Sequence, residues 1–229
     1  MKQNYLNWKN CDGIRYHERS DAFMGIPDKC NIEERYYWAI SRLKKHKIKS
    51  VLDVGCGLGY GTNLLFGMGF EVEGVDKSYC AIDVCKKRYP YINFTQSEFP
   101  GQALRKYDAI VANEIIEHVT NPEKFIKDCL NLISSGGILL ISTPNKRYIE
   151  GKNPHHLQEF TVDELKKLMP NFKIRGLTSH LFKGQRIFLK LLSYERMQKL
   201  KFLFSRLPII HGLPQYSHTL VIELEKHEF

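Results

Sequence analysis

Short apolar runs alternate along residues 50 to 145 with longer segments in which apolar side chains recur every three or four positions. Such runs are typical of strands buried on both faces, and the longer segments are typical of helices packed against a sheet. Strands are predicted in the run that leads into Asp53 and at 70–75, 91–94, 107–112 and 137–142, and helices at 31–46, 60–68, 78–88 and 122–133. This alternation with short turns predicts a doubly wound, mostly parallel α/β sheet.

The segment beyond residue 145 is less regular. Thr161 and Glu164 form a capping-box pattern that opens a further helix, and strands are predicted near 172–178 and 217–224. Between these strands, residues 185–206 mix long apolar side chains with basic ones. Two interpretations of that stretch stay open: a core helix or a lid over the acceptor site, which we favour, and peripheral contact with a membrane surface.

The turn after the first predicted strand is unusually rich in glycine. Residues 53–61 read D-V-G-C-G-L-G-Y-G and lead into a predicted helix. Glycines let the backbone turn sharply and approach a ligand at a helix N-terminus. A dinucleotide site favours G-x-G-x-x-G, which seats a pyrophosphate, whereas here an acid precedes alternate glycines. Because Asp53 would repel phosphate, the turn predicts a nucleotide-like ligand that carries a cationic amino group.

This turn and the segments after it resemble the class I S-adenosylmethionine-dependent methyltransferases, in which an acidic residue and G-x-G-x-G follow the first strand. The resemblance continues in chain order over 70–76, 94–98, 107–113 and 135–145, although Ser97 and Glu98 stand where the family has F-x-x-G-D. It implies a Rossmann-like, doubly wound, seven-stranded sheet, mostly parallel with an antiparallel last strand. We expect one domain over residues 1–229, with an N-terminal segment at 1–30 and acceptor-side loop and helices at 146–216.

The resemblance also assigns roles in binding S-adenosylmethionine. Asp53 would engage the methionine amino group directly or through water, Asp76 would accept hydrogen bonds from the ribose hydroxyls, and Glu98 would border the adenine. The implied cofactor-binding residues are Asp53, Gly55, Gly57, Gly59, Asp76, Glu98, Phe99 and Asn113. An acid about 20 residues beyond the glycines also occurs in NAD sites. A nicotinamide-dependent oxidoreductase is therefore the remaining enzyme alternative.

A second cluster of polar residues follows the fourth predicted strand. If residues 113–118 enter a helical turn, Glu114, Glu117 and His118 lie on one face, and His156 further along supplies another nitrogen donor. Such oxygen and nitrogen donors suit Mg²⁺, Mn²⁺ or Zn²⁺. His118 and His156 are also the candidate catalytic residues, because either one is able to take a proton from a hydroxyl acceptor. The alternative is that His118 lines the acceptor site or bonds to the backbone without any metal.

The pattern E-x-x-E-H followed by H-x-x-E-F-T resembles small-RNA 2′-O-methyltransferases, in which acids and histidines hold a metal. It is also similar to bacterial methyltransferases of polysaccharide and secondary-metabolite pathways and to ubiquinone-pathway O-methyltransferases. The chain has N-E-I-I at residues 113–116, where amino-methylating enzymes carry a P-P motif, so an oxygen acceptor is favoured. We expect O-methylation of a small molecule or a glycan. An RNA ribose 2′-O-methyltransferase and a non-catalytic S-adenosylmethionine-binding protein are the alternatives.

Composition and net charge add little to the predicted function. The net charge of +9 permits an anionic partner such as RNA, but the basic residues are spread along the chain, which favours a lysine-rich solvated surface. The six cysteines show no C-x-x-C spacing, and no apolar run reaches the roughly 18 residues of a membrane span. The N-terminus lacks an apolar signal-peptide core. We therefore expect a reduced, cytoplasmic protein; the oligomeric state is not predicted.

Overall fold

The computed structural model describes residues 26–99, 101, 105–149, 155–170, 172–177, 211–212 and 219–226. Its helices are α1 (Ile26–Lys45), α2 (Tyr60–Gly67), α3 (Tyr79–Arg88), α4 (Pro122–Leu132) and α5 (Val162–Leu168), with short 3₁₀ turns η2 (Ile116–His118) and η3 (Lys146–Tyr148). Its strands are β1 (Ser50–Val54), β2 (Glu71–Asp76), β3 (Asn93–Gln96), β4 (Tyr107–Asn113), β5 (Ile133–Pro144), β6 (Lys173–Leu177), β7 (His211–Gly212) and β8 (Thr219–Glu225).

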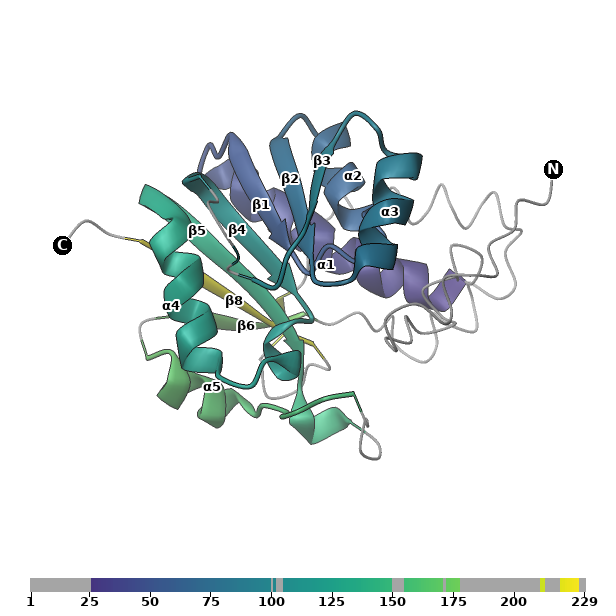
Figure 1. Ribbon diagram of the computed structural model, residues 1–229. Helices are drawn as coiled ribbons and strands as arrows, with labels where there is room; N and C mark the ends of the chain where they lie inside the picture. Colours follow the sequence, from purple (N-terminus) through teal and green to yellow (C-terminus); the bar gives the residue numbers. More distant parts are fainter. Residues whose placement is uncertain are drawn as a thin grey trace, which may run out of the picture.

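The strands form one sheet in the order β3-β2-β1-β4-β5-β8-β6-β7 (Figure 1). The first five strands in this order pair in parallel, and β8 pairs antiparallel with both β5 and β6. The predicted doubly wound sheet with an antiparallel last strand is confirmed; the two-residue β7 is an addition at its edge. Strand order reverses between β1 and β4, so ligands are expected at the carboxyl ends of these two strands.

Helices cover both faces of the sheet, and alternate strand residues supply the two cores (Figure 1). Val51 faces the core formed with α1, α2 and α3, whereas its neighbour Leu52 faces the core formed with α4 and α5. This period of two along each strand is the geometry of a pleated strand buried on both faces. The continuous apolar runs in the sequence follow from that double burial.

Helix starts agree with local capping chemistry. The side chains of Ser78, Asn121 and Thr161 accept backbone N–H groups at the starts of α3, α4 and α5, and Thr161 forms a complete capping box. The main boundary differences are in α1, which begins at residue 26 rather than 31, and in β5, which extends from 133 to 144 rather than from 137 to 142. The first residues of α1 lack helical periodicity, so the hydrophobic pattern placed the start of this helix too far along the chain.

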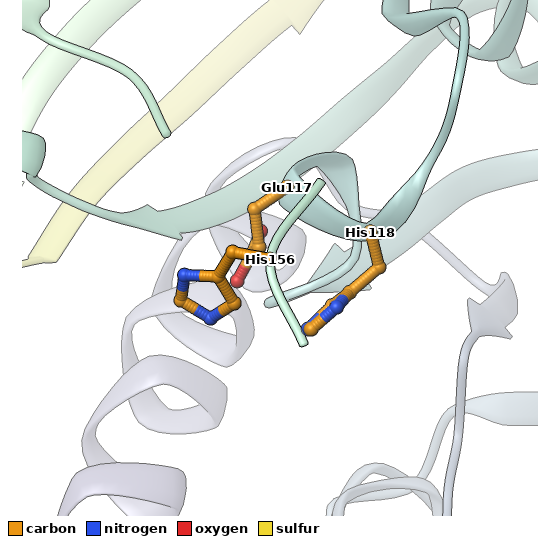
Figure 2. A group of neighbouring side chains, drawn as sticks. All are labelled: Glu117, His118 and His156. Carbon is orange, nitrogen blue, oxygen red and sulfur yellow. The ribbon is translucent and has the colours of Figure 1, made fainter. Parts of the chain in front are cut away.

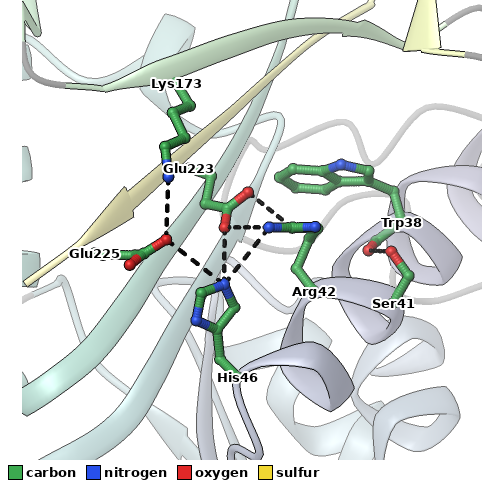
Figure 3. A network of polar contacts seen from close by, with 7 residues as sticks. All are labelled: Trp38, Ser41, Arg42, His46, Lys173, Glu223 and Glu225. Carbon is green, nitrogen blue, oxygen red and sulfur yellow. Dashed lines mark hydrogen bonds and ion pairs between the residues drawn. The ribbon is translucent and has the colours of Figure 1, made fainter.

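A polar network joins the last two turns of α1 to the antiparallel strand β8 (Figure 3). Arg42 donates two hydrogen bonds of 2.7 Å to the buried carboxylate of Glu223, through Nε and Nη2. His46 Nε2 lies 3.0 Å from the same carboxylate, and Lys173 pairs with Glu225 at 3.2 Å. Because Arg42 binds in a bidentate manner, this network fixes the rotation of α1 against the sheet.

The described residues also bear on the expected state of the cysteines and on the possibility of a membrane-spanning helix. Cys80 takes part in a disulfide, so the expectation of reduced cysteines is wrong for this one; Cys56, Cys85 and Cys129 are free. No helix among the described residues has both the length and the apolarity to cross a membrane. The stretch 185–206, and most of the expected segments 1–30 and 146–216, lie outside the described residues, so their assignment stays a prediction.

Candidate functional site

The glycine-rich turn adopts a backbone conformation that L-residues with side chains rarely take. Gly55, Gly57 and Gly59 have φ values of +70°, +53° and +75°. A Cβ on Gly55 would lie 2.0 Å from Ile115 Cδ1, which follows β4. The turn therefore passes closely over the chain after β4, at the point where strand order reverses. This is the position in which an open α/β sheet binds its ligand.

The carboxylate of Asp76 holds this turn from the end of β2. Its Oδ2 accepts the Gly57 N–H at 2.9 Å, and its Oδ1 accepts the Ser78 N–H at 2.9 Å. The Val75 carbonyl accepts the N–H groups of Gly55 and Cys56. The side chain of Asp76 is half-buried, at the end of the strand next to β1. This geometry is compatible with the predicted contact to ribose hydroxyls.

Asp53, at the end of β1, is fully buried rather than open to solvent. Its two oxygens lie 3.0 Å from the Tyr36 hydroxyl of α1, and Oδ2 also accepts the Thr62 hydroxyl of α2 at 2.7 Å. Burial raises the pKa of this carboxyl to about 7, against which the hydrogen bonds from Thr62 and Tyr36 act. The predicted role of Asp53 at an amino group stays a prediction, and the structure adds that two hydroxyls already hold the carboxylate.

Asn113 ends β4, the strand beside β1. Its Oδ1 and Nδ2 atoms are buried and have no hydrogen-bond partner in the described part of the chain. Buried amide groups are nearly always paired, so an amide with both atoms unpaired indicates a missing polar ligand. The other two candidates lie after β3: Glu98 is exposed, and Phe99 packs edge-to-face on Phe125 of α4, with centroids 5.5 Å apart.

Glu117, His118 and His156 come together beyond the end of β4 (Figure 2). One donor atom from each lies within 4.8 Å of the others. Glu117 Oε1 is buried with no partner among the described residues, while its Oε2 accepts the Thr143 hydroxyl at 3.0 Å. Burial and the nearby Glu114 raise the pKa of Glu117 well above its usual range. An unpaired buried carboxylate oxygen facing two imidazoles is a suitable place for a cation.

Both histidines are oriented through their Nδ1 atoms. His118 Nδ1 lies 2.8 Å from the backbone carbonyl of His155, and His156 Nδ1 lies 3.3 Å from a carboxylate oxygen of Glu159. If each Nδ1 carries the proton and donates it, each Nε2 keeps a lone pair, as in many histidines that bind metals. Burial lowers the pKa of His118, which favours the neutral form needed by a ligand or a base.

Glu114 does not join this group. The helical turn expected over 114–118 forms only from Ile116, because Glu114 itself has a φ of +55°. Its carboxylate instead accepts the Ser142 hydroxyl at 3.2 Å and lies 3.8 Å from the Arg35 guanidinium. The structure therefore brings together Glu117, His118 and His156, and places Glu114 beside them with partners of its own. Its role as a metal ligand stays a prediction.

Several residues of this region were not found from the sequence. Tyr36 stands at an apolar position of its helix, where a core residue is expected, and Thr62 carries no recognisable motif. Glu159 was part of the H-x-x-E pattern but had no assigned role. Of these residues, only Glu159 was indicated by the sequence, through its spacing from His156. The contacts of Tyr36 and Thr62 with Asp53 depend on how α1 and α2 pack, which spacing does not encode.

Comparison with known proteins places the chain among methyltransferases. The sequence model of a family described as "Methyltransferase domain" matches residues 32–183. The chain is 31% identical over 128 residues to a probable S-adenosylmethionine-dependent methyltransferase of Mycobacterium tuberculosis, covering 53% of this chain and 47% of that protein. It is 39% identical over 108 residues to the ubiquinone biosynthesis O-methyltransferase of Coxiella burnetii, covering 44% and 46%.

A solved structure shares the fold. The plantazolicin methyltransferase BpumL in complex with SAH (S-adenosylhomocysteine) aligns with a TM-score of 0.60 at 17% identity, covering 91% of this chain and 94% of that one. At this identity the likeness shows the fold alone. The chain spans about half the length of the two curated relatives described above.

Proposed function

Because the chain belongs to the methyltransferase-domain family, we propose that it transfers the methyl group of S-adenosylmethionine to a hydroxyl of a small molecule or a glycan. When bound, S-adenosylmethionine supplies an electrophilic sulfonium methyl. The residues of this chain would bind the cofactor, orient the acceptor and remove the hydroxyl proton. The observation that carries the proposal is the pair of features at the reversal of strand order: the left-handed glycine turn after β1 and the unpaired amide of Asn113 after β4.

Four features in and around the turn fit the cofactor. The glycines allow the left-handed backbone of the turn, and Asp76 would accept hydrogen bonds from ribose hydroxyls. The Asp53 carboxylate offers negative charge to the ammonium group of the methionine part. Asn113 has both a donor and an acceptor without partners, and either would be satisfied by the polar end of the ligand.

The group of Glu117, His118 and His156 would prepare the acceptor. We include a divalent cation in the proposal because Glu117 Oε1 is buried without a partner and the ligand atoms of the group lie within 4.8 Å of one another. A cation held there would lower the pKa of an acceptor hydroxyl. Most of the rate would come from alignment of the acceptor oxygen with the methyl group.

A second group of similar composition serves as a contrast. His46, Glu223 and Glu225 also bring one donor atom each within 4.8 Å of the others. However, Arg42 and Lys173 already neutralise the two carboxylates (Figure 3). A cation would have to displace these side chains, so we expect it to bind at Glu117 instead.

The test measures methyl transfer to a panel of hydroxylated small molecules, glycans and RNA ends, with and without EDTA. We expect transfer to a hydroxyl compound that EDTA abolishes and Mg²⁺, Mn²⁺ or Zn²⁺ restores. His156→Ala should abolish it with cofactor affinity nearly unchanged, whereas the matched variant His46→Ala should keep its cation dependence. Activity undiminished in EDTA would refute the cation, and preference for the RNA 3′ end would refute the small-molecule or glycan acceptor.

A further inference from the structure

The side chain of Tyr36 reaches the carboxylate of Asp53 at the end of β1, although Tyr36 belongs to helix α1, outside the sheet. Its side chain is 6% exposed, and its hydroxyl is 3.0 Å from each oxygen of Asp53. A phenol has one proton, so it donates to one carboxylate oxygen at a time. The pair therefore joins α1 to the end of β1, the strand that leads into the glycine-rich turn.

The ring of Tyr36 is fixed as tightly as its hydroxyl. A Cβ on Gly61, in the first turn of α2, would lie 1.8 Å from Tyr36 Cζ and 2.1 Å from Cε2. The ring thus packs directly on the backbone of α2, where no side chain is tolerated. One side chain therefore contacts the start of α2 and the end of β1.

We propose that Tyr36 is a positioning residue for cofactor binding: its hydroxyl holds the Asp53 carboxylate in the orientation that the ammonium group of the cofactor requires. The inference rests on the role of Asp53 in the proposed function. The Asp53 carboxylate is fully buried, so its orientation depends on the groups that bond to it, the hydroxyls of Tyr36 and Thr62. Of these two, only Tyr36 connects Asp53 to α1.

The charge of Asp53 gives the proposal a measurable signature. The groups that act on it are Tyr36 from α1, Thr62 from α2, Asp76 from β2 and the Cys56 thiol of its own turn. The hydrogen bond from Tyr36 lowers the pKa of Asp53, so removing this bond raises that pKa. The ammonium group favours ionised Asp53, and cofactor affinity should therefore fall below the pKa of this carboxyl.

The experiment is calorimetric titration with S-adenosylhomocysteine between pH 5.5 and 8, using the full chain. Tyr36→Phe keeps the ring on Gly61 and removes only the hydroxyl. We expect its affinity at pH 7 to fall about tenfold, since a hydrogen bond to a charged group is lost. The pH at which affinity begins to fall should also move upward. Tyr107→Phe changes another buried tyrosine, at the amino end of β4 and therefore at the opposite end of the strands from the site, and it should bind like the wild type.

Asp53→Asn separates this inference from the function on which it rests. This variant should bind S-adenosylhomocysteine more weakly, and its affinity should depend less on pH. If Asp53→Asn binds like the wild type, the role of Asp53 fails and the role of Tyr36 fails with it. If Asp53→Asn weakens binding but Tyr36→Phe leaves both affinity and its pH dependence unchanged, only the inference about Tyr36 is overturned. A loss of affinity in Tyr36→Phe with lowered melting temperature and no pH shift would mean a merely structural role, and would also overturn it.

Discussion

Replacing Asp53 with asparagine should stabilise the fold at alkaline pH while it weakens cofactor binding. The carboxyl of Asp53 is fully buried, and burial raises its pKa from 3.8 to about 7. Between these values the unfolded chain has released the proton and the folded chain retains it. Stability contributed by this group is therefore present at low pH and is lost as pH rises through the interval. Asparagine has a similar shape, can hydrogen-bond with both Tyr36 and Thr62, and does not titrate.

The magnitude follows from the two pKa values. Each pH unit within the interval changes the free energy of unfolding by about 1.4 kcal/mol, because one proton separates the two states. From pH 5 to pH 8 the stability of the wild type should therefore fall by about 3 kcal/mol relative to Asp53→Asn. Comparing the two proteins cancels the titration of all other groups that the substitution leaves unchanged.

The assay is urea unfolding of both proteins at several pH values, followed by circular dichroism. The expected result is a stability difference that moves in favour of Asp53→Asn as pH rises and levels off above pH 8. A difference that is independent of pH would refute the reasoning, as would a wild type that gains on the variant toward pH 8. The first result would mean that the Asp53 carboxyl titrates near its usual pKa in the folded chain, and the second that its pKa is not raised by folding.

Three further substitutions test how α1 and α5 are held. Gly61→Ala should displace the ring of Tyr36 and lower both the melting temperature and the affinity for S-adenosylhomocysteine; unchanged values would contradict the packing of α1 on α2. Arg42→Met removes the bidentate partner of the buried Glu223 carboxylate, with His46 still beside it, and should cost about 3 kcal/mol in urea unfolding, whereas a loss below about 1 kcal/mol would show that the pair contributes little. Thr161→Ala removes the cap of α5 and should cost about 1 kcal/mol by the same method; no change would show that packing alone sets this helix start.

Much of the fold could be predicted because the buried strands consist mainly of apolar residues. Residues 109–112 are apolar without interruption, and the structure places β4 at Tyr107–Asn113. Periodicity failed where it was absent from the sequence, as at the start of α1. The extended length of β5 was also missed, because Gly136 and Gly137 resemble a turn although both lie within the strand.

The sequence predicted that Glu117, His118 and His156 come together, but it did not predict the position of Glu114 or the contacts within the site. Spacing placed Glu114, Glu117 and His118 on one helical face, whereas the positive φ of Glu114 separates it from the other two. A backbone conformation of this kind depends on how the chain leaves β4, which residue spacing does not determine. The role of Tyr36 could not be predicted for a related reason, because a tyrosine within an apolar stripe resembles a core residue. Its hydroxyl contacts Asp53 only because α1 packs over that residue.

The central claim is that the glycine-rich turn binds S-adenosylmethionine rather than a dinucleotide. A thermal-shift titration of the full chain with S-adenosylhomocysteine and with NAD tests it most directly, with Asp76→Ala as the matched variant. We expect S-adenosylhomocysteine to raise the melting temperature of the wild type in a saturable manner, to do so much less in Asp76→Ala, and NAD to have no effect. Stabilisation by NAD without stabilisation by S-adenosylhomocysteine would contradict the account.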